Sequence, residues 1–223
     1  MTERHAEAYR GLRERTTALV RAAAPDALER TAPATPEWRV RDLLAHLVGV
    51  TADVAAGRLD GVATDAWTAA QVDARRDQSI DELLAEWDEL GPGFETTLTA
   101  VPPAVAGQAL FDAITHELDI RHALGEPGAR DCDAIDLAFD FCIDTRVASG
   151  APAVRVVHEA GEAVSGAGEP VAAVTTTRFD YVRAVSGRRT AEEITGYEWE
   201  GTADPGLVFF GAIFTMRTEP LGE

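Results

Sequence analysis

The chain has 223 residues, 46% hydrophobic and 26% charged, a composition typical of a folded protein with one large domain or two modest ones. Its formal net charge of -18 at pH 7 argues against nucleic acid or an anionic membrane as a partner, because both would repel this surface unless it carried a basic patch, and the sequence has none. We find neither a signal peptide nor an apolar run of about eighteen residues, so we expect a cytoplasmic protein.

Helices are expected in the first 150 residues, where apolar positions recur at helical spacing between Pro and Gly interruptions. Ser79 and Glu82 have the spacing of a capping box, and the Gly-Pro-Gly segment at 91–93 should break or kink the helix that they begin. Residues 61–78 have a weaker pattern. The expected helices cover residues 3–23, 40–56, 79–99, 106–124 and 135–148. Antiparallel helices of this kind form a bundle, whose interior can hold a metal site.

The character of the sequence changes after Gly150. Residues 153–160 and 170–177 are β-branched runs between Gly-rich turns, which indicates strands, and residues 178–187 favour a helix. We therefore expect two domains, a helical bundle over residues 1–150 and a small α+β domain over residues 151–223, and so an α+β fold overall.

The two cysteines, Cys132 and Cys142, are too few for a disulfide framework and lack the paired spacing of a zinc-thiolate site. We expect both to be buried structural thiols.

One segment of the fourth expected helix carries a dense group of acidic and histidine side chains. Asp112 and His116 are four residues apart, so a helix presents this carboxylate and imidazole on one face as half of a metal site. Asp119 lies close enough to that face to accept a hydrogen bond from a ligand imidazole. Glu117 and Arg121 should face elsewhere as a solvated ion pair.

A third ligand for a metal in the bundle would have to come from another helix. His46 is the candidate, because its neighbours Leu43, Leu44, Leu47 and Val48 give it an apolar helical setting. Spacing alone favours a different interpretation, in which His46 is a core histidine bonded to a backbone carbonyl.

Three segments resemble the mycothiol-dependent maleylpyruvate isomerase family, a branch of the DinB-like helical bundles. The first two are "WRVRDLLAHL" at 38–47 and "DAITHELDIRHALG" at 112–125. The third, "FDYVRAVSGRRT" at 179–190 followed by Trp199, is similar to the small C-terminal domain of many members. The resemblance covers nearly the whole chain and implies a DinB-like bundle with a small C-terminal domain.

The resemblance also implies a metal site and a cofactor. His46, Asp112 and His116 match the family's ligands for a divalent metal, which would be zinc, and three protein ligands leave one position open. In the family this position is thought to take a thiol cofactor, mycothiol, whose thiolate adds to an electrophile. The founding enzyme has glutamate where this chain has Asp112. Because aspartate is one methylene shorter, either the helices approach more closely or the metal site is weaker or absent.

Arg183, Arg188 and Arg189 could bind an anionic group, since guanidinium groups match carboxylates well, although surface ion pairing is their commoner fate. We expect Arg183 and Arg188 to contribute to binding the cofactor.

Three functions remain open from the sequence. The favoured one is a mycothiol-dependent metalloenzyme, either a thiol S-transferase or an isomerase, acting on a small electrophile. The second is a metal-free or degenerate bundle that binds a small ligand without catalysis. The third is an interaction protein whose acidic surface recognises a basic partner. The sequence indicates neither the electrophile nor the oligomeric state.

Overall fold

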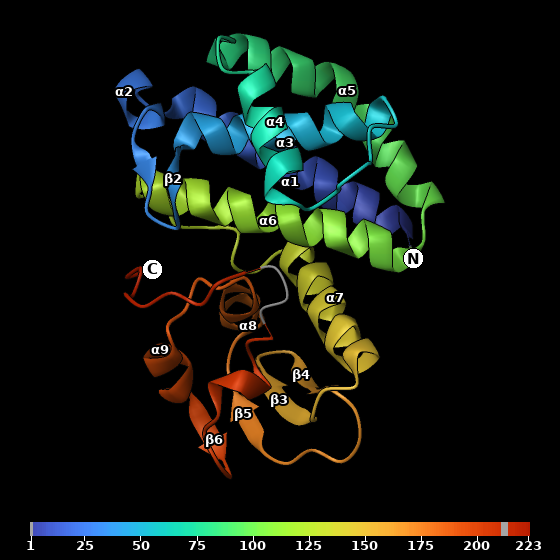
Figure 1. Cartoon of the computed structure of the whole chain (residues 1–223), viewed down its shortest axis with the longest axis vertical. Helices are drawn as coiled ribbons and strands as arrows, with labels where there is room; N and C mark the ends of the chain where they lie inside the picture. The colour runs from blue at the N-terminus through green and yellow to red at the C-terminus, as the bar shows by residue number, and fades with distance from the viewer. Residues whose placement is uncertain (1, 211–213) are drawn as a thin grey trace. The chain divides into compact units, whose positions relative to one another are not determined.

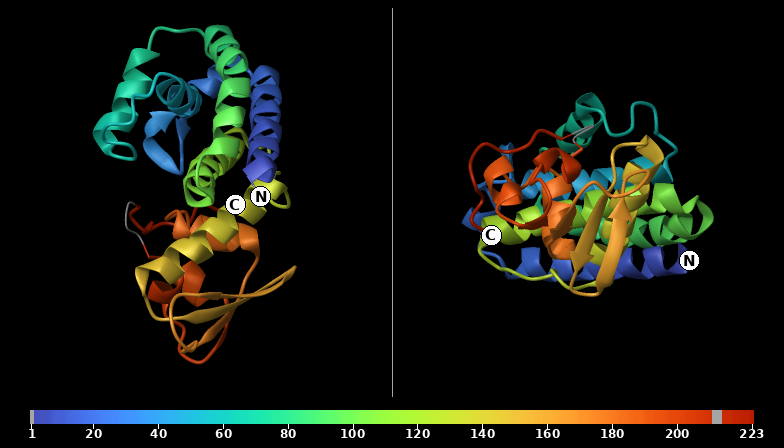
Figure 2. Two further views of the ribbon diagram at one scale, coloured as in Figure 1. Left: turned by 90° about the vertical axis from the view of Figure 1, so that its right-hand side faces the viewer. Right: turned by 90° about the horizontal axis from the view of Figure 1, so that it is seen from below.

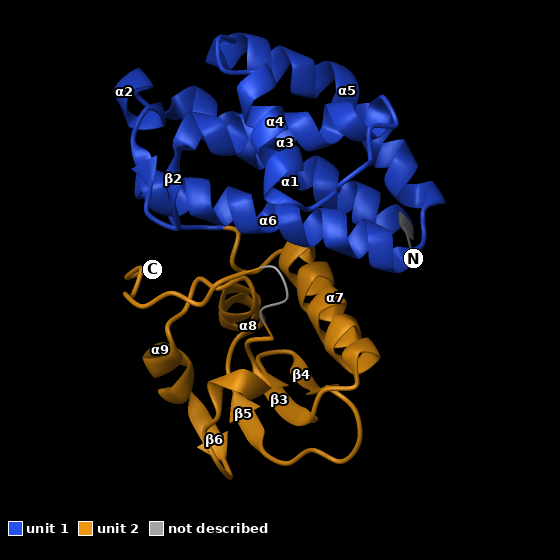
Figure 3. Cartoon of the chain, viewed as in Figure 1, with its two compact units in different colours: residues 1–128 blue, residues 129–223 orange. Residues whose placement is uncertain are grey.

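The structure is a computed structural model that describes residues 2–210 and 214–223 (Figure 1). The chain divides into two compact units, unit 1 over Met1–Gly128 and unit 2 over Ala129–Glu223 (Figure 3). Along the described part of the chain, no helix is both long and apolar enough to cross a membrane.

Unit 1 is a bundle of long helices with a short hairpin. Its elements are α1 (Thr2–Ala22), α2 (Pro25–Leu28), β1 (Thr31–Ala32), β2 (Thr35–Arg39), α3 (Val40–Ala55), α4 (Asp65–Ala74), α5 (Ile80–Ala100) and α6 (Pro103–Leu124). Helix α1 packs against α5 and α6, and α3 packs against α4, α5 and α6 (Figures 1 and 2). Because α3 contacts both α4 and α6, side chains from three helices can meet around it.

The hairpin of β1 and β2 was not expected from the sequence. Its strands pair antiparallel, with Thr31 opposite Arg39 and Ala32 opposite Thr35. The backbone N–H of Arg39 then donates to Asp42 Oδ2 at 2.9 Å, which satisfies one of the free donors at the start of α3. The hairpin therefore leads directly into the helix that carries His46.

A break or a kink was expected at residues 91–93, and the structure excludes the break, because helix α5 continues from Ile80 to Ala100 with Pro92 inside it. The capping box that begins it is present, with Glu82 N–H donating to Ser79 Oγ at 3.2 Å and Ser79 N–H donating to Glu82 Oε2 at 2.7 Å. Buried Trp87 and Phe94 on the two sides of Pro92 hold both halves in the core. This packing offsets the backbone hydrogen bond that proline removes.

Unit 2 is a small α+β unit. Its elements are α7 (Asp133–Ser149), β3 (Val154–His158), β4 (Gly161–Ser165), β5 (Ala173–Thr175), α8 (Arg178–Val185), α9 (Ala191–Thr195), β6 (Glu198–Glu200) and the 3-10 helix η1 (Pro205–Leu207). The sheet has the order β4-β3-β5-β6, in which β3 pairs antiparallel with β4 and parallel with β5, and β5 pairs antiparallel with β6. The expected α+β class, with a helical N-terminal part, is confirmed.

The two units divide at residues 128 and 129, earlier than the boundary expected near Gly150. Helix α7, which the sequence grouped with the bundle, packs against α8 and β4. The ring of Phe139 on α7 lies 5.2 Å from the ring of Tyr181 and 4.9 Å from that of His158. The apolar face of α7 is thus buried within unit 2, and helical periodicity alone does not report which partner buries it.

Both cysteines are free thiols within unit 2. Cys142 is buried, and burial raises the pKa of its thiol above the ordinary value, which suits a structural role. Cys132 is only half-buried, and its Sγ lies 3.4 Å from the carbonyl oxygen of Ala129.

Candidate metal centre

Two helices of unit 1 bring two imidazoles and a carboxylate together. His46 comes from α3, and Asp112 and His116 come from successive turns of α6. One ligand atom of each residue lies within 4.8 Å of those of the other two. Nε2 of His46 is 3.3 Å from Asp112 Oδ2, and Nε2 of His116 is 3.6 Å from Asp112 Oδ1. The three residues named from the sequence therefore converge.

The three side chains differ in their contact with solvent. Those of His46 and His116 are 4% and 10% exposed, whereas that of Asp112 is 37% exposed. The ring centroid of Trp38, from β2, lies 5.3 Å from that of His46 and 5.9 Å from that of His116. The imidazoles are therefore held in an aromatic, mostly dry environment, and the site is accessible on the side of the carboxylate.

The length of Asp112 is sufficient for this geometry. Its two oxygens reach both imidazoles without the extra methylene of glutamate, since α3 and α6 pack directly against each other. The shorter side chain therefore does not prevent Asp112 from meeting both histidines.

The simpler interpretation expected His46 to bond to a backbone carbonyl, but its second ring nitrogen has a side-chain partner instead. Its Nδ1 lies 2.7 Å from Oε1 of Gln71, on α4. Gln71 is buried, and it was missed because residues 61–78 have a weak helical pattern. A local signal was present at Thr64, whose Oγ1 accepts the N–H of Trp67 at 3.3 Å and caps α4.

His116 has a carboxylate on each side of its ring. Its Nδ1 lies 3.4 Å from Oδ2 of the fully buried Asp119, which is within ion-pair distance but does not have the geometry of the hydrogen bond expected from the spacing. Burial lowers the pKa of His116 below the ordinary value, and it outweighs the opposing influence of Asp119 and Asp112. The neutral imidazole that burial favours is also the form that can bind a metal.

Glu117 corrects the expectation of a solvated ion pair. Its side chain is 0% exposed, and its carboxylate accepts hydrogen bonds from Arg15 on α1 at 2.8 and 3.0 Å and from Arg121 Nε at 3.0 Å. The expected pairing with Arg121 exists, but the partner on α1 buries it. Glu117 thus connects α6 to α1 and takes no part in the cluster around Asp112.

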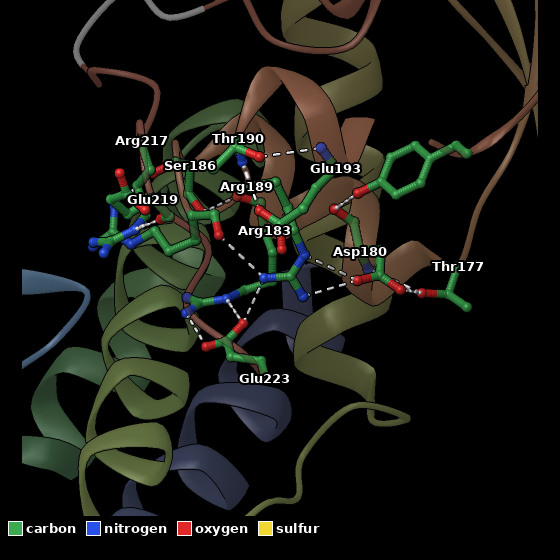
Figure 4. Close-up of polar contacts among 12 residues, drawn as sticks. Thr177, Asp180, Arg183, Ser186, Arg189, Thr190, Glu193, Arg217, Glu219 and Glu223 are labelled. Carbon is green, nitrogen blue, oxygen red and sulfur yellow. Dashed lines mark hydrogen bonds and ion pairs between the residues drawn. The ribbon is translucent and has the colours of Figure 1, made fainter. Parts of the chain in front are cut away.

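The arginines proposed for cofactor binding, Arg183 and Arg188, lie in unit 2 and are buried. Figure 4 shows the polar contacts around Arg183. Nε of Arg183 donates to Glu223 Oε2 at 3.0 Å, and Nη1 of Arg189 donates to the same oxygen at 2.7 Å. Arg188 donates to the carbonyl oxygen of Ser186 at 2.6 Å, and its guanidinium lies 5.5 Å from the ring centroid of Phe214. These groups form an internal network, which differs from the surface pairing that is commoner for arginine.

A family model described as the mycothiol maleylpyruvate isomerase N-terminal domain matches residues 9–115. The match begins in α1 and ends in α6, so it includes His46 and Asp112 and stops one residue before His116. A search of curated proteins and a search of solved structures each found no match. The match supports, over residues 9–115, the resemblance to the mycothiol maleylpyruvate isomerase family that the sequence motifs indicated.

Proposed function

We propose that unit 1 binds a divalent metal ion, zinc in the first place, through His46, Asp112 and His116. We further propose that the metal activates a thiol cofactor, mycothiol, toward a small electrophilic substrate. The family of residues 9–115 supports a mycothiol-related enzyme. The convergence of the three ligand atoms within 4.8 Å is the observation that carries the metal site.

The donor set fits zinc. Two imidazole nitrogens and one carboxylate oxygen are ordinary zinc ligands, and three protein ligands are the number found in catalytic rather than structural sites. The second nitrogen of each imidazole faces a polar partner, Gln71 for His46 and Asp119 for His116. Such partners are typical of metal-binding histidines, because they hold the ring and its tautomer in place.

The residues of the site account for the chemistry that follows. A bound zinc ion with an open position would lower the pKa of a coordinated thiol and so supply a thiolate near neutral pH. The carboxylate of Asp112 offsets part of the positive charge, while the buried imidazoles and Trp38 limit the access of water. A thiolate formed in this way can be joined to the electrophile, as in a transferase, or added and later expelled, as in an isomerase.

A role for Arg183 and Arg188 in cofactor binding is a separate proposal that concerns unit 2 alone. Arg183 already binds a carboxylate, that of Glu223, and its side chain is 0% exposed. An anionic group of a ligand would therefore have to replace Glu223. We also propose a cytoplasmic location, as expected from the sequence.

The second candidate is a metal-free bundle that binds a small ligand without catalysis. It is favoured by one observation, namely that Asp112 lies within ion-pair distance of both histidines and can pair with them directly. In this case the cluster is a structural contact between α3 and α6.

Metal analysis of protein purified without an affinity tag, with and without added zinc, separates the two candidates. The proposed enzyme should contain about one zinc per chain, and cobalt substitution should give visible absorption bands of a four-coordinate site. Cobalt should also quench the fluorescence of Trp38, with Trp38→Phe as the control. Formation of a thiol adduct with a model electrophile then tests catalysis. Protein that takes up no metal under any of these conditions would refute the proposal and leave the metal-free bundle.

A further inference from the structure

A buried chain of polar side chains connects the candidate metal centre to the surface between α3 and α4. Nδ1 of His46 lies 2.7 Å from Gln71 Oε1, and Gln71 Nε2 donates to Asp53 Oδ2 at 2.8 Å. The other oxygen of Asp53 accepts a hydrogen bond from Arg58 Nε at 2.9 Å. Gln71 is 2% exposed and Asp53 is 8% exposed, whereas the side chain of Arg58 is largely in solvent.

The chemistry of these groups determines which atom donates and which accepts in each hydrogen bond of this series. A guanidinium only donates and a carboxylate only accepts, so the amide nitrogen of Gln71 has to face Asp53. The amide oxygen of Gln71 then faces His46, and His46 has to donate from Nδ1. Because Nδ1 keeps its proton for Gln71, Nε2, which lies 3.3 Å from Asp112, is the nitrogen that can offer a lone pair to a metal.

The position of Gln71 depends on a glycine in the middle of α3. A Cβ atom at Gly49 would lie 2.5 Å from Cβ and 2.8 Å from Cγ of Gln71, so α4 could not keep its present distance. His46, Gly49 and Asp53 are three and four residues apart and lie along one stripe of α3, which Gln71 spans. Glycine inside a helix costs about 1 kcal/mol relative to alanine. Its presence here allows the close approach that both hydrogen bonds of Gln71 require.

We infer that Gln71 is a positioning residue of the metal centre, and that Asp53 determines which way its amide points. Together they hold His46 as the Nδ1–H tautomer, with Nε2 available to the metal. This inference rests on the proposed function for its consequence, since the tautomer matters for zinc only if zinc binds. The tautomer itself is a property of the metal-free protein and can be measured separately.

Long-range 1H–15N NMR of the histidine rings in the metal-free protein tests the tautomer directly. The unaltered protein should show His46 protonated at Nδ1, and Gln71→Leu should give the other tautomer or a mixture. Zinc affinity, measured by competition with a chromophoric chelator, should fall about 10–100-fold in Gln71→Leu, as is typical when the partner of a ligand imidazole is removed. The visible spectrum of the cobalt-substituted protein should change as well.

A matched control and a rescue separate positioning from general stability. Gln78→Leu makes the same chemical change at a half-buried glutamine that is bonded to Glu86 at 3.3 Å, and it should leave zinc affinity unchanged. Gln71→Glu alone places two carboxylates face to face and should weaken zinc binding. Adding Asp53→Asn supplies an amide donor for the new carboxylate, which can still accept from His46, so the double variant should regain most of the lost affinity.

Gly49→Ala alters no hydrogen-bonding group, yet it should weaken zinc binding because it displaces Gln71. If Gln71→Leu fails to fold, the zinc affinity of Gly49→Ala tests the inference in its place. Zinc affinities of Gln71→Leu and Gly49→Ala within twofold of the unaltered protein would overturn the inference and leave the metal site intact. A His46 that carries no proton at Nδ1 in the metal-free protein would overturn it as well. Absence of zinc binding by the unaltered protein would instead refute the proposed function, and with it the role of Gln71.

Discussion

Nε2 of His46 lies 3.3 Å from Oδ2 of Asp112, although the two residues belong to different helices and are far apart in the sequence. Their closeness results from the packing of α3 against α6. It places a carboxylate of intermediate exposure beside a buried imidazole, and the same carboxylate faces His116. The contact is either one edge of a metal site or a structural pair, and substitution of Asp112 distinguishes the two.

Replacing Asp112 with Ala should lower zinc affinity by more than the roughly 10–100-fold that is typical for a residue behind a ligand, because it removes a coordinating oxygen and a negative charge. The free energy of unfolding of the metal-free protein should change little, since Asp112 is partly exposed and solvent screens its pairing with the histidines. Zinc competition and urea unfolding, each with and without chelator, measure the two effects. Asp112→Glu, which keeps a carboxylate, is the control and should retain zinc. Unchanged zinc stoichiometry and affinity in Asp112→Ala would show that Asp112 is no ligand.

Replacing Glu117 with Gln should destabilise unit 1 by about 1.5–3 kcal/mol, because the buried carboxylate holds Arg15 and Arg121 through charge-assisted hydrogen bonds. Urea unfolding in the presence of chelator measures this loss. Zinc affinity should stay the same, since Glu117 lies outside the cluster around Asp112. Asp26→Asn, which breaks the exposed pair with Arg30, should have no measurable effect on stability. Equal effects of the two substitutions would contradict the burial of Glu117.

Stability should fall at alkaline pH because of Tyr9. Burial raises its pKa from 10.0 to about 12, against hydrogen bonds with Thr51 and Trp87. The unfolded chain therefore loses the phenolic proton first, so the contribution of Tyr9 is complete below pH 10 and is lost as pH rises from 10 to about 12. A shift of this size corresponds to roughly 3 kcal/mol.

Urea unfolding at several alkaline pH values checks this decline, and ultraviolet titration of tyrosinate in the folded protein checks the pKa itself. Tyr9→Phe should unfold with a shallower dependence on pH. The slope is not expected to vanish, because burial also raises the pKa of Tyr181 and of Tyr197. Titration of all three tyrosines near pH 10 in the folded protein would disprove the prediction.

Acid should weaken the network around Glu223 in unit 2. Burial raises the pKa of its carboxyl, but the charge of Arg183 and hydrogen bonds from Arg183 and Arg189 outweigh this effect and hold the pKa below the ordinary 4.5. The resulting stability is present above the pKa of the unfolded chain and is lost as pH falls through the lower, folded value. Glu223→Gln should therefore destabilise unit 2 near neutral pH and much less in acid.

Hydrogen exchange of α8 as a function of pH measures this difference, since the helix carries Arg183. Glu219→Gln, at an exposed position of the same segment, is the control and should leave the exchange of α8 unchanged. A constant difference between Glu223→Gln and the unaltered protein at all pH values would argue against the lowered pKa.

The sequence by itself was sufficient for the features that depend on local spacing. Helical periodicity and the capping box of Ser79 and Glu82 located the main helices of the bundle, and β-branched runs located the strands around β3 and β5. The four-residue spacing placed Asp112 and His116 on one face of α6. The apolar helical setting of His46 made it the candidate third ligand, and the resemblance to the family favoured this role over that of a core histidine.

Only the tertiary structure decided features that depend on which surfaces meet. Helix α7 joined unit 2 because its apolar face is buried by α8 and β4, and α5 continued through Pro92 because the core packs both of its halves. Glu117 is buried because Arg15 reaches it from α1. Gln71 became part of the site because Gly49 allows α4 to approach α3. In each case the deciding contact joins residues of different elements, and a local pattern carries no information about a partner that is distant in the chain.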